Sequence, residues 1–278
     1  MNTLAAGRRH SVACREDGTV VATGDGRAGE CDVSSWSGIC AVAAGNVHAA
    51  RNTGRSHSVG LRSDGTVLAT GWNGDGQTDI GRWRGIVAVA AGWRTTLGLR
   101  SDGTVVATGR TAEGQCDVAA WKDAVSIACG DWHSVAVLAD GTALSTGSNR
   151  RGQCAVGGWQ DLIGIGAGYL HTVGLRVDGT ALATGDNTAG QCDVTRWRTV
   201  VAVSAGSHHT VALLADGTVR AVGDNHHRQC EVAEWRGVTA VAAGSAHTLG
   251  RLDDGTVIAT GDNSHGQCDV RPWRLLAG

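Results

Sequence analysis

The sequence predicts an all-β fold, a seven-bladed β-propeller built from repeats of 38 residues. One phrase recurs seven times, and its Asp-Gly-Thr turns begin at Asp17, Asp64, Asp102, Asp140, Asp178, Asp216 and Asp254. The first interval is 47 residues and the other five are 38. Repeats that hold several short strands are typical of propellers, whose blades bury their flat faces against one another. The first and last copies carry the whole phrase, which favours a closed ring over a solenoid with atypical end repeats.

Each repeat contains three strong strand candidates and a weaker fourth. In the fifth copy these are residues 163–167, 171–175, 181–184 and 191–194. Short runs of Val, Ala, Leu and Thr bounded by glycine predict strands, and no apolar run keeps helical spacing for long. Asp-Gly between two such runs predicts a hairpin with a type I′ turn, in which both central residues have positive φ.

Two residue types recur at fixed places and predict how the blades pack. A tryptophan ends every copy, and its large apolar surface predicts a wedge between blades. These are Trp36, Trp83, Trp121, Trp159, Trp197, Trp235 and Trp273. Six copies carry a histidine after Gly-x-x, and so many equivalent histidines indicate a repeated hydrogen-bonding post. They are His10, His57, His133, His171, His209 and His247, with Thr95 in the third copy.

The cysteines indicate a reducing compartment. Six of the nine recur near the end of the repeat, as Cys31, Cys116, Cys154, Cys192, Cys230 and Cys268. Equivalent positions on neighbouring blades lie too far apart for a disulfide, so we expect small buried residues. With no apolar run of signal-peptide or membrane-span length, the sequence predicts a soluble cytoplasmic protein with no membrane partner.

The chain is expected to form a single domain over residues 1–278. Its closure is open at the sequence level, because residues 3–7 and 275–278 both resemble the first strand of a repeat. Only one of the two segments is expected to fill that place in the ring.

The motifs Gly-x-x-His-Ser/Thr, Asp-Gly-Thr-Val and Gly-Asp-Asn-x-x-Gly-Gln resemble the repeat of the regulator of chromosome condensation (RCC1-like) family. The resemblance covers nearly the whole chain, and the short unit is most similar in length to the bacterial propeller that inhibits β-lactamases. It implies a propeller that acts as a protein-binding disc. It does not name the partner, because one fold hosts many functions.

The copies differ mainly on one side of the predicted disc. Because successive strands alternate in direction, the loops after the first and third strands leave on one face, here the variable face. The Asp-Gly-Thr turns and the tryptophan connections leave on the other, the turn face. Three tryptophans outside the wedge position (Trp72, Trp93 and Trp132) and the only tyrosine, Tyr169, fall on the variable face. Aromatic and arginine residues gathered on one surface are typical of an interface centre.

The first functional hypothesis is therefore a propeller that binds a protein partner through an aromatic–arginine arc opposite a histidine–aspartate arc. The predicted binding residues are Arg9, Arg55, Trp72, Trp93, Arg94, Arg110, Asp131, Trp132, Tyr169, His208, His226 and His265, with Arg8, Arg150, Arg151 and Asp262 beside them. Self-association is a variant of this hypothesis, because tryptophan–arginine pairs could join two discs.

An enzyme is the alternative hypothesis. The long interval places about nine extra residues within residues 46–54, in the first loop of blade two, and propeller insertions often lie on the binding face. This loop could cover a pocket at the channel mouth that holds a small-molecule ligand. Histidine is the usual acid–base group near neutral pH, so the catalytic candidates are His48, His208, His226, His227 and Asp224. No sequence motif supports a reaction type, which makes this hypothesis the weaker one.

Neither a metal nor a cofactor is expected. A metal site needs three or four ligands that converge at about 2 Å, which the adjacent His226 and His227 in one loop rarely provide. The formal charge of −2 disfavours a nucleic-acid partner, since acidic residues nearly cancel the arginines.

Overall fold

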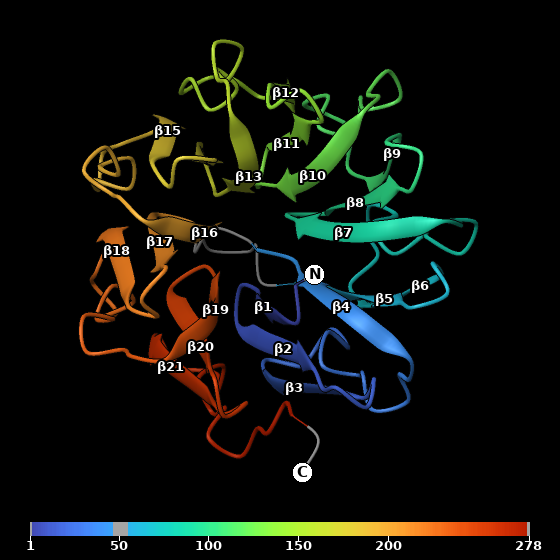
Figure 1. Ribbon diagram of the computed structural model, residues 1–278. Coiled ribbons are helices and arrows are strands. Elements are labelled where there is room, and N and C mark those ends of the chain that lie inside the picture. Colours follow the sequence, from blue (N-terminus) through green and yellow to red (C-terminus); the bar gives the residue numbers. More distant parts are fainter. Residues whose placement is uncertain (1, 47–54, 277–278) are drawn as a thin grey trace.

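The computed structural model describes residues 2–46 and 55–276. Its 21 short strands form seven antiparallel sheets of three strands each. The sheets stand around a central channel like the blades of a propeller, with their first strands innermost (Figure 1). This confirms the predicted all-β, seven-bladed fold. The described residues contain no helix that could cross a membrane.

Each blade consists of three strands that are consecutive in sequence. The blades are, in order, β1 (Leu4–Ala6), β2 (His10–Cys14) and β3 (Val20–Gly24); β4 (Ile39–Ala44), β5 (His57–Arg62) and β6 (Val67–Gly71); β7 (Ile86–Gly92), β8 (Thr95–Arg100) and β9 (Val105–Gly109); β10 (Ala124–Cys129), β11 (His133–Leu138) and β12 (Ala143–Gly147); β13 (Leu162–Ala167), β14 (His171–Arg176) and β15 (Ala181–Gly185); β16 (Val200–Ala205), β17 (His209–Leu214) and β18 (Val219–Gly223); β19 (Val238–Ala243), β20 (His247–Leu252) and β21 (Val257–Gly261).

The predicted fourth strand is wrong. In the fifth copy residues 191–194 adopt turns and irregular backbone. Their backbone groups are used locally: Val194 N–H donates to the Cys192 carbonyl at 2.8 Å, and Trp197 N–H donates to the Val194 carbonyl at 2.9 Å. The segment therefore presents no row of free backbone N–H and C=O groups that could pair with the third strand.

The predicted type I′ turn is wrong as well. In the Asp17–Gly18 turn of the first copy only Gly18 has positive φ, at 78°. Gly18 N–H donates to the Arg15 carbonyl and Arg15 N–H to the Thr19 carbonyl, the pattern of a type I turn followed by a glycine bulge. One carboxylate oxygen of Asp17 accepts from both the N–H and the hydroxyl of Thr19, at 2.8 and 2.6 Å, which fixes the aspartate in the turn.

Six histidines link the blades through buried hydrogen bonds, as predicted. Each Nε2 lies 2.8–3.0 Å from a serine or threonine hydroxyl of the next blade. That hydroxyl donates in turn to a backbone carbonyl at 2.7–2.8 Å. Because a hydroxyl has only one proton, the imidazole must donate from Nε2, and each histidine is the neutral Nε2–H tautomer. The bond from His247 to Ser11 joins blade seven to blade one and closes the ring.

The glycine of Gly-x-x-His makes room for this histidine. A Cβ on Gly7 would lie 2.3 Å from Cε1 of His10, and a Cβ on Gly168 would lie equally close to His171. Glycine and histidine thus form one packing unit.

The recurrent tryptophans lie between blades, as predicted. Trp36 of blade one covers Gly60 in the middle strand of blade two, where a Cβ would come within 2.7 Å of the indole. Where the copies have alanine instead, as at Ala136, the residue is fully buried in the same cluster as the preceding tryptophan, Trp121. A small residue under each indole lets neighbouring sheets approach closely.

The ring closes with residues from both ends of the chain, contrary to the expectation that one segment would fill the first-strand place. Leu4–Ala6 forms β1 and pairs with β2. Leu275 fills the turn-face end of that place: its N–H donates to the Gly255 carbonyl, and its carbonyl accepts from Glu16 N–H, both at 2.9 Å. Its side chain is 1% exposed in a cluster with Leu4 and Trp273. A strand split between the two ends ties the last blade to the first.

All nine cysteines are free. The six recurrent ones are half-buried rather than buried, and each thiol approaches the carbonyl of the residue six positions earlier, as Cys192 does with Asp186 at 3.3 Å. Burial raises the pKa of Cys192 to about 11. These thiols hold the loop that follows the third strand of the blade.

The histidine ring predicts a steep loss of stability in mild acid. Burial lowers the pKa of the six histidines to about 3 or 4, against 6.5 for an accessible imidazole. The unfolded chain therefore takes up protons first as the pH falls below about 6.5, and each histidine costs about 1.4 kcal/mol of unfolding free energy per pH unit down to about pH 4. The pH dependence of the unfolding free energy, measured by urea unfolding between pH 7.5 and 5, should correspond to the uptake of nearly six protons on unfolding. The His171→Gln variant should take up one proton fewer. A flat profile would contradict neutral buried histidines.

The split strand predicts a large effect at the end of the chain. Leu275→Ala should reduce the free energy of unfolding by about 2–5 kcal/mol, because it opens a cavity at the closure. Leu276→Ala is the matched control, since its neighbouring side chain is only half-buried. Equal losses for both variants in urea unfolding would argue against closure through Leu275.

Candidate functional site

The strand register brings the two variable loops of each blade together. In blade one His10 pairs with Gly24, and Asp25 N–H donates to the Arg9 carbonyl at 2.8 Å. The same bond recurs in the other blades, for example from Asp186 to Leu170. Residues of both loops therefore share one surface.

Five predicted residues of the variable face form a continuous stack across blades two to four. The guanidinium carbon of Arg94 lies 4.4 Å from the ring centroid of Trp72 and 4.5 Å from that of Trp93. Arg110 lies 5.6 Å from both Trp93 and Trp132. The two indoles of Trp93 and Trp132 meet edge to face, with centroids 4.4 Å apart. Such alternation of cations and aromatic rings fixes side chains that would otherwise move freely.

The three tryptophans of this stack differ in exposure. Trp93 is only 7% exposed, whereas Trp72 and Trp132 are half-buried. Trp93 therefore supports the stack from below, and its two neighbours present the accessible edges.

Blade three shows how the sequence builds this arrangement. It lacks the histidine post. The pairing of β7 with β8 extends one residue further than in the other blades, to Gly92 and Thr95. Trp93 and Arg94 become a two-residue hairpin turn, in which Arg94 takes φ of 61°. Left-handed backbone is unusual for a residue with a side chain, and it directs Arg94 and Trp93 into the stack.

Both stacked arginines have acidic partners that the sequence reasoning missed. Arg94 lies 3.2 Å from Asp75, and Arg110 makes a two-pronged contact with Glu113 at 2.7 and 2.9 Å. Hydrogen bonding from Arg110 lowers the pKa of Glu113, so the pair is charged near neutral pH. The spacing of three residues between Arg110 and Glu113 is a signal that could have shown the second pair.

A cavity of about 320 Å³ adjoins the stack on the side of Trp132. It is lined by Arg110, Glu113, Trp132, Ser148, Arg150, Arg151, Tyr169 and Leu170. Tyr169 also meets His208 edge to face, with centroids 5.2 Å apart. The aromatic arc thus continues into blade five, and Trp132 and Tyr169 both line the cavity.

The histidine–aspartate arc consists of separate local contacts. Asp224 contacts His226 and accepts from the Gln229 amide at 3.0 Å. In the equivalent loops of blades five and seven, the Thr188 hydroxyl donates to Asp186 and the Ser264 hydroxyl donates to Asp262. A contact that recurs with other residue types belongs to the loop scaffold and does not single out His226 or Asp224 for catalysis.

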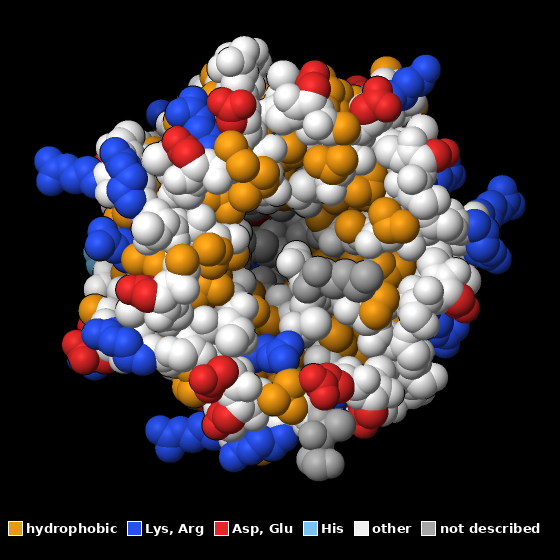
Figure 2. Space-filling view, viewed as in Figure 1, with side chains coloured by type: hydrophobic (Ala, Val, Ile, Leu, Met, Phe, Trp, Pro, Cys, Tyr) orange, Lys and Arg blue, Asp and Glu red, His pale blue; other side chains and the backbone are white. Residues whose placement is uncertain are grey.

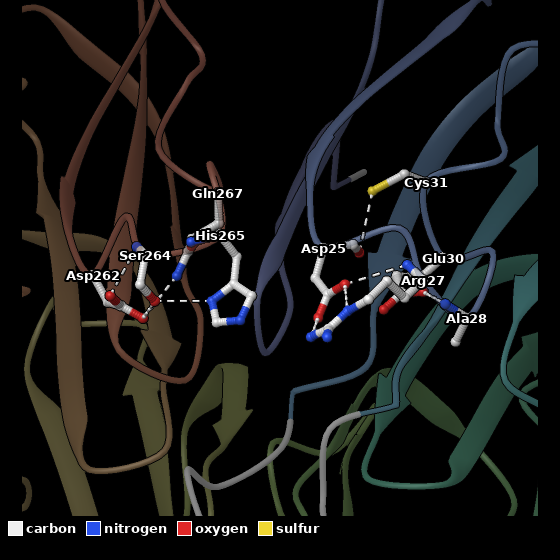
Figure 3. A network of polar contacts seen from close by, with 9 residues as sticks. All are labelled: Asp25, Arg27, Ala28, Glu30, Cys31, Asp262, Ser264, His265 and Gln267. Atoms are coloured by element: carbon white, nitrogen blue, oxygen red, sulfur yellow. Dashed lines mark hydrogen bonds and ion pairs between the residues drawn. The ribbon is translucent and has the colours of Figure 1, made fainter.

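The loops of blades seven and one show this scaffold at the closure (Figure 3). Ser264 bonds both Asp262 and His265, and His265 points towards the Asp25–Arg27 pair of the neighbouring loop. The hydrogen bond from Arg27 lowers the pKa of Asp25 to about 2, so this carboxylate remains ionised near neutral pH. The contacts order the loops, and His265 hydrogen-bonds to Ser264 rather than to a carboxylate.

The central channel is lined by small side chains, and most of its accessible surface is polar. A cavity of about 150 Å³ is lined mainly by Ala, Val and Ile of the innermost strands. At the variable face Asn46 reaches from blade two to blade six, where its amide lies 3.4 Å from the Ala205 carbonyl and 3.5 Å from the Ser207 hydroxyl. Arg8 and Asp131 are buried, at 5% and 1% exposure.

None of the described catalytic candidates lines this cavity. His208, His226, His227 and Asp224 all lie outside it. His48 and residues 47–54 lie outside the described part of the chain. Across residues 2–46 and 55–276, no three His, Cys, Asp or Glu side chains are grouped to hold a metal ion.

The turn face has a feature that the sequence comparison did not single out. The inner strands of blades three to six each carry an exposed apolar residue at a β-bulge, namely Val87, Val125, Ile163 and Val201, which are 44–55% exposed. Figure 2 shows hydrophobic side chains around the channel mouth and charged ones of both signs along the rim.

A family model and solved structures match this chain. The model of the regulator of chromosome condensation (RCC1) repeat matches seven segments, residues 3–30, 52–77, 86–115, 124–153, 163–191, 200–229 and 238–267. Human WBSCR16 is similar in structure, with a TM-score of 0.67, 17% identity, and coverage of 96% of this chain and 91% of that one. Prp20p from Saccharomyces cerevisiae is also similar in structure, with a TM-score of 0.65 and 17% identity. The match covers 97% of this chain and 84% of that one. No curated protein sequence matches significantly.

The difference in exposure predicts different roles for the stacked tryptophans. Trp93→Ala should cost about 3–5 kcal/mol of unfolding free energy, because it removes a buried indole. Trp72→Ala should cost about 1 kcal/mol, since it mainly loses one cation–π contact at the surface. Urea unfolding of the two variants measures this contrast, and similar values would show that Trp93 is not a buried support.

Proposed function

Because this chain belongs to the regulator of chromosome condensation (RCC1) repeat family, we propose that it is a protein-binding propeller that recognises its partner through the variable face. The observation that carries the proposal is the stack of Trp72, Arg94, Trp93, Arg110 and Trp132. Tryptophan, tyrosine and arginine are the residues that most often dominate the energy of protein interfaces.

The stack is ordered before any partner arrives. Arg94 is held by two indoles and by Asp75, and Arg110 by two indoles and by Glu113. Ordering long side chains on binding normally costs about 0.5–1.5 kcal/mol each, so an ordered surface retains more of its contact energy as affinity. The cation–π pairs lie within one chain, which leaves the exposed edges of Trp72 and Trp132 for a different molecule.

The structural relatives support use of the fold as a binding disc. Yeast Prp20 has been seen bound to Kap60, and Prp20p has been studied for binding to Gsp1p and histones. At 17–18% identity these structures show a shared fold, and the partner of this chain must be sought through its own loops.

The enzyme alternative lacks a comparable arrangement among the described residues. The described candidate histidines and Asp224 lie in loops with local partners, and none of them lines the small cavity at the axis. General acid–base chemistry needs groups within hydrogen-bond reach of a common substrate atom.

Removing the accessible aromatic groups tests the proposal. Trp132→Ala with Tyr169→Ala should reduce capture of partner proteins from a lysate of the source organism at least tenfold, because two anchor side chains are lost. The matched control is Val177→Ala with Val201→Ala, which removes exposed apolar groups from the turn face. Quantitative mass spectrometry should find partners that the control retains and the aromatic variant loses. Undiminished capture by the aromatic variant, or equal loss in both, would count against the variable face.

A further inference from the structure

The cavity lined by Trp132 and Tyr169 has its own chemical character. We call it the arginine pocket, after Arg110, Arg150 and Arg151 among its lining residues. These three guanidinium groups face a single carboxylate, that of Glu113. The loops that supply them come from blades three and four, and the opposite wall comes from blade five.

The one acidic group of the pocket is already engaged. Both oxygens of Glu113 accept from Arg110, and one of them also accepts from the Gln115 amide at 3.2 Å. Glu113 therefore neutralises Arg110 and has little capacity left for the other two arginines.

Arg150 and Arg151 are the unneutralised cations. Both are exposed, and within residues 2–46 and 55–276 neither guanidinium makes an ion pair at the distances found for Arg94 and Arg110. Each presents a planar set of N–H donors that matches a carboxylate in a two-pronged contact.

The remaining polar groups of the pocket add hydroxyl donors. Burial and the nearby carboxylates of Asp131 and Asp186 raise the pKa of Tyr169, so its phenol keeps its proton, and the positive charge of Arg151 opposes them only in part. Ser148 contributes a second hydroxyl. Donors thus outnumber free acceptors, and the cavity is chemically suited to an anion.

The apolar walls narrow the choice of anion. The rings of Trp132 and Tyr169 and the side chain of Leu170 leave space of about 320 Å³, the lower end of the range of ligand pockets. A singly charged carboxylate with an apolar neighbour suits two free guanidinium groups beside aromatic rings. Inorganic phosphate has no apolar part to cover these rings, and its oxygens beside them would lack hydrogen-bond donors.

We propose that the arginine pocket binds a carboxylate side chain in an acidic segment of a protein partner, with an adjacent apolar side chain against Trp132 and Tyr169. The inference rests on the proposed function and specifies the kind of partner. It makes Arg150 and Arg151 the residues that determine specificity, beside the aromatic anchors.

Peptide binding tests the pocket with the full chain. The probe is a fluorescein-labelled peptide of alternating glutamate and leucine, and its glutamine counterpart has the same size without charge. We expect the glutamate peptide to bind at least tenfold more tightly. Arg150→Gln with Arg151→Gln should weaken its binding at least tenfold, and the corresponding lysine pair should restore part of the affinity, because lysine keeps the charge but not the two-pronged geometry.

The matched control is Arg82→Gln with Arg196→Gln, two exposed arginines of the tryptophan connections on the turn face. This pair should leave peptide affinity unchanged, which separates a local site from general attraction to positive charge. All four arginines are exposed, so the variants should keep the wild-type unfolding midpoint, to be checked in urea.

Each contrary outcome has a definite meaning. The inference fails if both double arginine variants lose the same affinity for the glutamate peptide. It also fails if the glutamate and glutamine peptides bind equally well. If benzoate or inorganic phosphate binds there and the glutamate peptide does not, the pocket takes a small anion and the inference fails. If partner capture falls with Trp132→Ala and Tyr169→Ala but not with the arginine pair, the inference fails while the proposed function stands. If neither affects capture, both fail.

Discussion

The fold depends on a buried imidazole that holds two blades together. Each histidine donates from Nε2 to a hydroxyl of the next blade, and that hydroxyl donates to a backbone carbonyl. The arrangement needs a neutral ring, a glycine beside it and a short hydroxyl side chain. Loss of the ring or the hydroxyl leaves a buried polar group without its partner, and a side chain in place of the glycine would clash with the imidazole. The repeat keeps this set in six copies because every blade depends on its neighbours.

The one departure from this set coincides with the candidate site. Thr95 stands where the other copies have histidine, and the strand pair beside it extends into a two-residue turn. That turn holds Trp93 and Arg94, the centre of the aromatic–arginine stack. The blade without a histidine link is thus the one that supplies the centre of the stack, and the six histidine links of the other blades hold the ring together.

The scaffold also explains why titratable residues of the loops are poor evidence for catalysis. The aspartate that begins the loop after a third strand accepts from a buried glutamine amide, as Asp186 does from Gln191 at 3.0 Å. The residue two positions later bonds the same carboxylate, whether it is threonine, serine or histidine. A histidine two positions after the aspartate therefore has an ordinary local role. It lies next to the aspartate because the repeat places that position there.

The sequence by itself determined the ring of seven blades, the tryptophan wedges and the histidine posts, because each is repeated and a repeated letter must serve the repeated packing. It also placed the unusual aromatic residues on one face, through strand direction alone. Tertiary structure decided the rest. It buried Trp93 and left Trp132 accessible, paired Arg94 with Asp75 from another blade, and opened the arginine pocket between loops of three blades. It also divided the closing strand between Leu4–Ala6 and Leu275. These outcomes depend on side chains distant in sequence that meet only when the ring closes, so no local pattern could specify them.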